Sequence, residues 1–171
     1  MLLLLSAMPM GQMPVLEIDG KKIHQSLSIC RLLAKKFGLD GKTDFENFEI
    51  DSIADTVNDL RHKIATTYYE TDAANKERKY KILNDEIIPF YLNKLDEIAK
   101  ANDGHLALKR MTWADVWFTG LLEYMNFTAK QDLTAHHPNL KRVFDNTAAV
   151  PGIKKWFDIR PKNDDMIKSL K

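Results

Sequence analysis

The chain has 171 residues, 44% of them apolar, so it is long enough to fold around a core as one large domain or two small ones. Its 25 lysine and arginine residues nearly cancel its 24 aspartate and glutamate residues. This balance gives no overall field that would favour nucleic acid or an anionic membrane, and we expect neither as a partner.

A single cysteine, Cys30, excludes an internal disulfide framework and suits a reducing compartment, so we expect a cytoplasmic protein. The opening MLLLLSA has no basic region, and its apolar run is far shorter than the roughly 20 residues that cross a bilayer. We therefore expect it to be neither a signal peptide nor a membrane anchor.

The first structured segment reads as a β-hairpin followed by a helix. Residues 15–18 are expected to form a strand, Asp19-Gly20 a tight turn, and residues 22–24 the returning strand. Ser26 is a favoured N-cap residue, and Gly38 stands where a left-handed C-terminal residue belongs. Together they predict a helix of three turns.

From residue 43 onward the pattern is helical. Residues 43–46 (TDFE) form a capping box, and a long helix carries a predicted apolar stripe of Phe45, Phe48, Ile53, Val57, Leu60, Ile64 and Tyr68. A second long helix is expected over residues 75–100, antiparallel to the first and kinked at Pro89.

Thr112 and Asp115 form another capping box, which opens an apolar and therefore central helix over residues 116–127. We interpret both residues as structural. Pro138 and Pro151 stand at first helical positions and predict two shorter helices that end near residue 160. Residues 162–171 are expected to be a frayed tail.

The sequence therefore predicts a mostly α protein. Residues 1–40 form a small unit of a β-hairpin plus a helix, and residues 43–161 form an all-helical domain.

The small unit carries a candidate peptide-binding slot. A cis Met13–Pro14 bond would turn the backbone N–H and C=O of Met13 outward, where the sheet does not pair them. At the following helix start, the Ser26 hydroxyl, the free N–H groups and the positive dipole end favour a carboxylate. The pattern favours a short acidic peptide, although Met-Pro is also common at an edge strand and Ser26 also suits a simple N-cap.

The stretch GQMPVLEIDGKKIHQS, with TWAD and DSIADTVNDLRH further on, resembles the sigma-class glutathione transferases, which include haematopoietic prostaglandin D synthase. The resemblance runs over about residues 8–161. It implies that the small unit is a partial thioredoxin-like domain lacking its first strand, first helix and second strand, and that the helical unit is the transferase C-terminal domain.

The resemblance also implies a glutathione site. Pro14 would be the cis-proline, and the backbone of Met13 would pair with the cysteinyl part of glutathione. Gln25 and Ser26 would hold the γ-glutamyl carboxylate and amine, and Gln12 would lie near the glycyl end.

These transferases are homodimers in which an acidic residue of the first long helix reaches the neighbour's glutathione site, a role that falls on Asp59. Asp51, Asp55 and Asp59 share one helix face, which is otherwise read as a solvated face. Asn58 stands where relatives that bind a divalent ion have aspartate, so we expect no metal. The acceptor pocket is assigned by alignment to Arg61, Ile64, Ala65 and Thr66.

The family activates the glutathione thiol with a tyrosine hydroxyl, and residues 1–13 contain no tyrosine. Only the thiolate attacks, and a free thiol has a pKa of about 8.5, so we expect this chain to be weak or inactive alone. We expect no cofactor. Glutathione would be the co-substrate, and the second substrate would be a small hydrophobic electrophile or a prostaglandin-type endoperoxide. The alternative is a non-catalytic binding or crystallin-like helical subunit.

Overall fold

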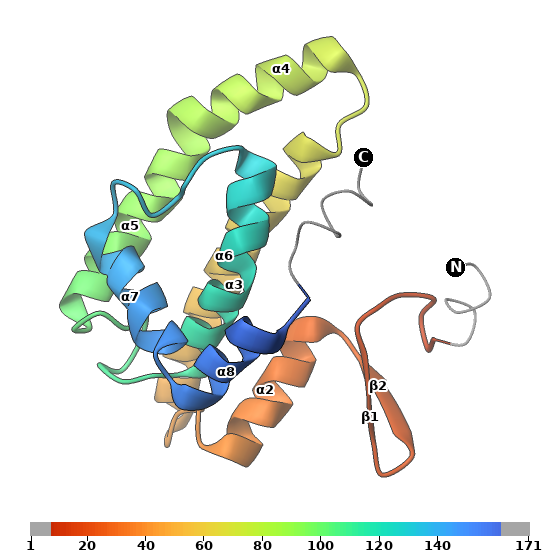
Figure 1. The fold of residues 1–171 in the computed structure, drawn as a ribbon, viewed down its shortest axis with the longest axis vertical. Coiled ribbons are helices and arrows are strands. Elements are labelled where there is room, and N and C mark those ends of the chain that lie inside the picture. Colours follow the sequence, from red (N-terminus) through yellow and green to blue (C-terminus); the bar gives the residue numbers. More distant parts are fainter. Residues whose placement is uncertain (1–7, 162–171) are drawn as a thin grey trace.

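A computed structural model of the chain describes residues 8–161, so the expectations for the opening MLLLLSA and for the tail lie outside the described residues. The described part is mostly helical, with one two-stranded sheet. Figure 1 shows the hairpin projecting from one end of the helix that follows it, away from the remaining helices. The fold class expected from the sequence, a short thioredoxin-like unit followed by a helical domain, is confirmed.

The hairpin consists of β1 (Val15–Ile18) and β2 (Lys21–His24), paired antiparallel. Val15 faces His24 in the register, so the two ends of the hairpin meet beside the start of the next helix. The turn residues Asp19 and Gly20 both have positive φ, at 50° and 74°, as a two-residue hairpin turn requires.

Helix α2 (Ser26–Phe37) follows at once and ends at Gly38, whose φ of 69° allows its N–H to bond to the Ala34 carbonyl. The prediction that Ser26 is the N-cap was wrong. Gln25 occupies that position with φ 73° and ψ 104°, and its side chain does not cap the helix, so Ser26 is the first helical residue.

Helix α3 (Asp44–Tyr68) starts at the predicted cap, where the Thr43 hydroxyl accepts the N–H of Glu46 at 3.2 Å. The expected capping box is only half formed, since the Glu46 carboxylate accepts from Lys42. The stripe prediction was wrong at its start, because Phe45 and Phe48 are 86% and 70% exposed. The buried face of α3 is a different one, which carries Ile50, Ala54, Val57, Leu60 and Ile64.

The second long helix is divided into α4 (Ala73–Ile82), a π-helical turn η1 (Leu83–Ile87) and α5 (Ile88–Ala101). The π-helical turn ends just before Pro89, where the sequence predicted a kink. Proline has no N–H to give to the carbonyl four residues earlier, and its ring crowds that carbonyl. A wider turn relieves this conflict.

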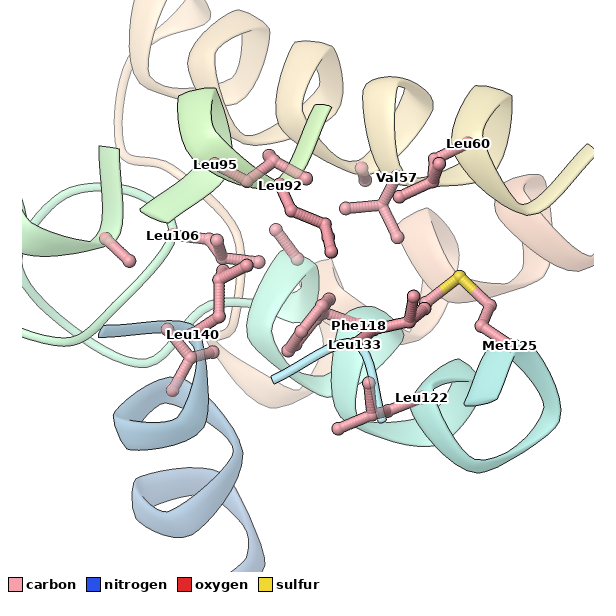
Figure 2. Close-up of a cluster of buried hydrophobic side chains, with 14 of the residues drawn as sticks. Val57, Leu60, Leu92, Leu95, Leu106, Phe118, Leu122, Met125, Leu133 and Leu140 are labelled. Atoms are coloured by element: carbon pink, nitrogen blue, oxygen red, sulfur yellow. The ribbon is translucent and has the colours of Figure 1, made fainter. Parts of the chain in front are cut away.

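Helix α6 (Trp113–Ala129) is central, and α7 (Pro138–Ala148) and α8 (Pro151–Ile159) complete the fold, each with proline at its first position as predicted. Figure 2 shows side chains of α3, α5 and α6 meeting in one core, with Phe118 of α6 between Leu92 of α5 and Leu122. None of the helices in residues 8–161 is long and apolar enough to cross a bilayer.

Candidate functional site

The hairpin brings the two predicted binding segments together. A recess of about 70 Å³ lies where the chain before β1 meets the junction of β2 and α2. The Met13–Pro14 peptide bond at this place is cis, and the Met13 side chain is 71% exposed. The recess is lined by Met10, Gln12, Met13, Pro14, His24, Gln25 and Ser26. Five of the six residues assigned to glutathione binding therefore share one surface.

The backbone of Gln25 is held in an unusual conformation at this recess. Its φ of 73° lies in a region that non-glycine residues rarely occupy, and such residues cluster at binding and active sites. The first N–H groups of α2 have no partner inside the helix, and the first turn contains no acidic side chain. The positive end of this helix is therefore open to a carboxylate from outside.

The recess also contains two residues that the sequence reasoning missed, Met10 and His24. His24 is the last residue of β2 and pairs with Val15, so the register of the hairpin carries it to the rim. Its position directly before the Gln-Ser pair was a usable signal. Met10 comes from an irregular segment, whose course no periodic pattern reveals.

Asp59 does not line the recess of its own chain. The aspartates one and two turns before it, Asp55 and Asp51, are held by Arg31 of α2. Arg31 Nη2 donates to Asp55 at 2.8 Å, while its Nε forms an ion pair with Asp51 at 3.0 Å without hydrogen-bond geometry. Within residues 8–161, Asp59 forms no such ion pair, and it is exposed.

The four residues assigned to an acceptor pocket face different surroundings. Ile64 is fully buried in the core and Ala65 is 9% exposed. The Arg61 Nε donates to Asn58 at 3.0 Å, and the exposed Thr66 donates to the His62 carbonyl at 3.0 Å. Their assignment to one pocket therefore stays a prediction.

All five tyrosines of the chain lie outside the recess. The Tyr80 hydroxyl donates to the Thr128 carbonyl at 2.8 Å. Burial, followed by a hydrogen bond and charge interaction with Tyr69, raises the pKa of Tyr124 to about 12, although Arg61 acts in the opposite direction. Tyr124 is thus a poor stabiliser of a thiolate and also lies away from the recess.

The capping box at the start of α6 is fully buried. The Asp115 carboxylate accepts the Thr112 N–H at 2.8 Å, the Thr112 hydroxyl at 2.9 Å and the Leu106 N–H at 2.9 Å. All three residues have no exposed surface. Asp115 therefore joins the preceding loop to the central helix and takes no part in the recess.

The chain matches two family models. The model of the glutathione S-transferase C-terminal domain matches residues 58–160, and that of the N-terminal domain matches residues 2–35. The chain belongs to the glutathione S-transferase family. The C-terminal match covers most of the helical domain, and the N-terminal match includes the recess.

Two insect relatives are similar to this chain over most of its length. Glutathione S-transferase S1 of Drosophila melanogaster is 53% identical over 154 residues, which are 90% of this chain and 62% of that protein. Glutathione S-transferase of Anopheles gambiae is 52% identical, over 90% of this chain and 76% of that protein. The chain thus spans less than two thirds of the length of the first relative and about three quarters of the length of the second.

A solved structure shows the same fold. Prostaglandin synthase D of Nilaparvata lugens superimposes with a TM-score of 0.88 at 38% identity, covering 93% of this chain and 79% of that chain. Hematopoietic prostaglandin D synthase of Gallus gallus is 36% identical over 164 residues. The relatives therefore include proteins named for conjugation and proteins named for prostaglandin synthesis.

Proposed function

We propose that the chain is a sigma-class glutathione transferase that binds glutathione in the recess. Gln25 and Ser26 would hold the γ-glutamyl group, the Met13 backbone the cysteinyl part, and Gln12 the glycyl end. The observation that carries this proposal is the meeting of Met13–Pro14 with the open N-terminus of α2 in one recess. Such a helix end suits a carboxylate.

We further propose a homodimer in which Asp59 reaches the neighbour's recess. Two features of α3 support it. Asp59 is exposed and free of the Arg31 ion pairs that hold Asp51 and Asp55. Phe45 and Phe48 are largely exposed on the same helix, as is expected of side chains that a second copy would cover.

In complete homologues the reaction would be attack of the glutathione thiolate on a small hydrophobic electrophile, or isomerisation of a prostaglandin-type endoperoxide. Burial raises the pKa of the Cys30 thiol, which makes it a poorer nucleophile, and Cys30 does not line the recess. No tyrosine hydroxyl lines the recess within residues 8–161. We therefore propose that the 171-residue chain alone binds glutathione with weak or no turnover, and that it resides in the cytoplasm.

The lack of a tyrosine at the recess within residues 8–161 also favours a second candidate, a non-catalytic binding or crystallin-like helical subunit. The two differ in whether any glutathione is consumed, because the transferase keeps a weak turnover and the subunit has none. Conjugation of an activated aryl chloride by the purified chain, with Ser26→Ala as the matched variant, tests them. Weak glutathione-dependent turnover that Ser26→Ala reduces would establish the enzyme and contradict the non-catalytic subunit. An absence of turnover, with sedimentation showing a dimer, would favour the binding subunit.

A further inference from the structure

An apolar groove of about 320 Å³ lies where the small unit meets the helical domain, between α2 and α6. One wall is the face of α2 that carries Cys30, Leu33 and Phe37, which are spaced three and four residues apart. Phe37 is 68% exposed. No charged side chain of residues 8–161 lines the groove, and it shares no lining residue with the glutathione recess. An open apolar surface of this kind is one that another apolar segment would cover.

The α6 side of the groove is bare at Gly120. Glycine inside a helix is less favourable than alanine, so a glycine in the middle of a helix usually has a packing reason. Residues 8–161 supply none here, because a Cβ atom built on Gly120 would have no neighbouring atom within 4 Å. The space beside the α6 backbone is therefore free for a side chain that comes from elsewhere.

The opening segment MLLLLSA has the composition that suits this groove. Four of its seven residues are leucines, and none is charged. The leucine run is too short to cross a bilayer, and the proposed contacts with glutathione do not involve it. Removing leucine side chains from water is favourable, so an apolar groove within reach is their natural site.

The groove lies within reach of this segment. Met10 lines the recess together with Ser26, the first residue of α2, so the chain passes the start of that helix five residues after Leu5. Five residues span up to about 17 Å when they are extended. Cys30 and Leu33 lie only about 6 and 11 Å along α2 from Ser26, at the helical rise per residue. The leucines can therefore lie along the groove without any movement of α2.

We propose that residues 1–7 lie in this groove and hold the small unit against the helical domain. The leucines pack against Leu33 and Phe37 of α2 and against Trp117 of α6, and they cover the Cys30 thiol. This contact reinforces the link between the units that the Arg31 ion pairs already make. Because the groove and the recess are separate, the contact requires no glutathione.

Cys30 is the only cysteine of the chain and lines the groove, so its thiol reports whether the groove is covered. The assay is the rate at which N-ethylmaleimide modifies the 171-residue chain in the absence of glutathione. Replacing Leu3→Gln and Leu4→Gln together should raise this rate about tenfold or more, because both side chains lose their preference for the groove. The matched control, Ser6→Gln, adds the same amide to the same segment without removing an apolar group and should leave the rate unchanged.

A second pair of variants tests the contact from the side of the groove. Gly120→Leu fills the space beside α6 and should displace residues 1–7, so that chymotrypsin cleaves within the leucine run about tenfold faster. Mass spectrometry of the products identifies this cleavage. Gly152→Leu on α8 is the matched control, because a Cβ atom at Gly152 also has no neighbour within 4 Å and this residue does not line the groove. Cleavage of the control should equal that of the wild type.

Equal maleimide rates in the wild type and the double leucine variant would overturn the proposal. Equal cleavage of Gly120→Leu and Gly152→Leu would overturn it as well. Dilution separates the segment of the same chain from that of a second copy, since only protection by a second copy is lost when the protein is diluted about a hundredfold. Protection of Cys30 that is lost on dilution would contradict docking within one chain and assign the groove to a second copy.

Discussion

Replacement of Asp115 by alanine should be among the most destabilising single changes in the chain. The carboxylate accepts three hydrogen bonds from Thr112 and Leu106, and all of these groups are buried. Asp115→Ala leaves two backbone N–H groups without a partner, each costing about 1–3 kcal/mol, and also removes a helix cap. We expect the free energy of unfolding to fall by about 3–5 kcal/mol and the melting temperature by about 10 °C or more.

Urea unfolding followed by circular dichroism measures this change, with Asp145→Ala as the control. Asp145 lies on α7 in a surface ion pair with Lys141 at 2.8 Å and is 53% exposed, so its loss should change stability by at most about 0.5 kcal/mol. Similar midpoints for the two variants would refute the role given to the buried carboxylate. The unfolding midpoint of Asp115→Asn should lie between those of Asp115→Ala and Asp145→Ala. The asparagine amide keeps one accepting oxygen, but its NH₂ group faces the other donors.

Two further predictions concern charged groups. Arg31→Met should loosen α2 from α3, because it removes the contacts to Asp51 and Asp55. Hydrogen exchange should then become faster in α2 while α6 stays protected, and unchanged exchange in α2 would contradict this. The hydrogen bond from Lys79, with those from neighbouring backbone N–H groups, lowers the pKa of Glu70 to about 2. The ionised Glu70 therefore stabilises the fold at pH values above the ordinary glutamate pKa, and this contribution is lost as the pH falls through the lowered pKa of Glu70. Glu70→Gln should have a lower melting temperature than the wild type at pH 7, and the two melting temperatures should converge as the pH falls from about 4 toward 2. A constant difference across this range would show that Glu70 does not act through its charge.

The parts of the fold that the sequence predicted well depend on local chemistry. Asp19-Gly20 gave the hairpin because both residues accept the positive φ that the turn demands. Pro138 and Pro151 gave two helix starts, because proline at a first helical position loses no hydrogen bond. Thr112 and Asp115 predicted a cap because the residues involved are three apart in the chain.

The predictions that failed depend on tertiary surroundings. Phe45 and Phe48 lie on the face of α3 that carries Asp51 and Asp55, away from the face of the fully buried Ile50, and only the packing of the neighbouring helices decides which of these faces is covered. Ser26 has the better side chain for an N-cap. Gln25 takes the position because the strand end and the helix start are joined through its left-handed backbone, which the sequence pattern does not encode.

The candidate site was predictable to a similar degree. The Met-Pro and Gln-Ser segments were found because each carries a distinctive local geometry, and the short hairpin between them left little freedom in how they meet. The assignment of Ile64 rested on alignment alone, and its side chain lies in the core.

The central claim is that the open N-terminus of α2 holds the γ-glutamyl end of glutathione. Isothermal titration of the chain with glutathione and with cysteinylglycine, which lacks that group, tests it most directly. We expect glutathione to bind measurably more tightly and Ser26→Ala to weaken glutathione while leaving cysteinylglycine unaffected. Equal binding of the two peptides, or glutathione binding that Ser26→Ala does not change, would contradict the account.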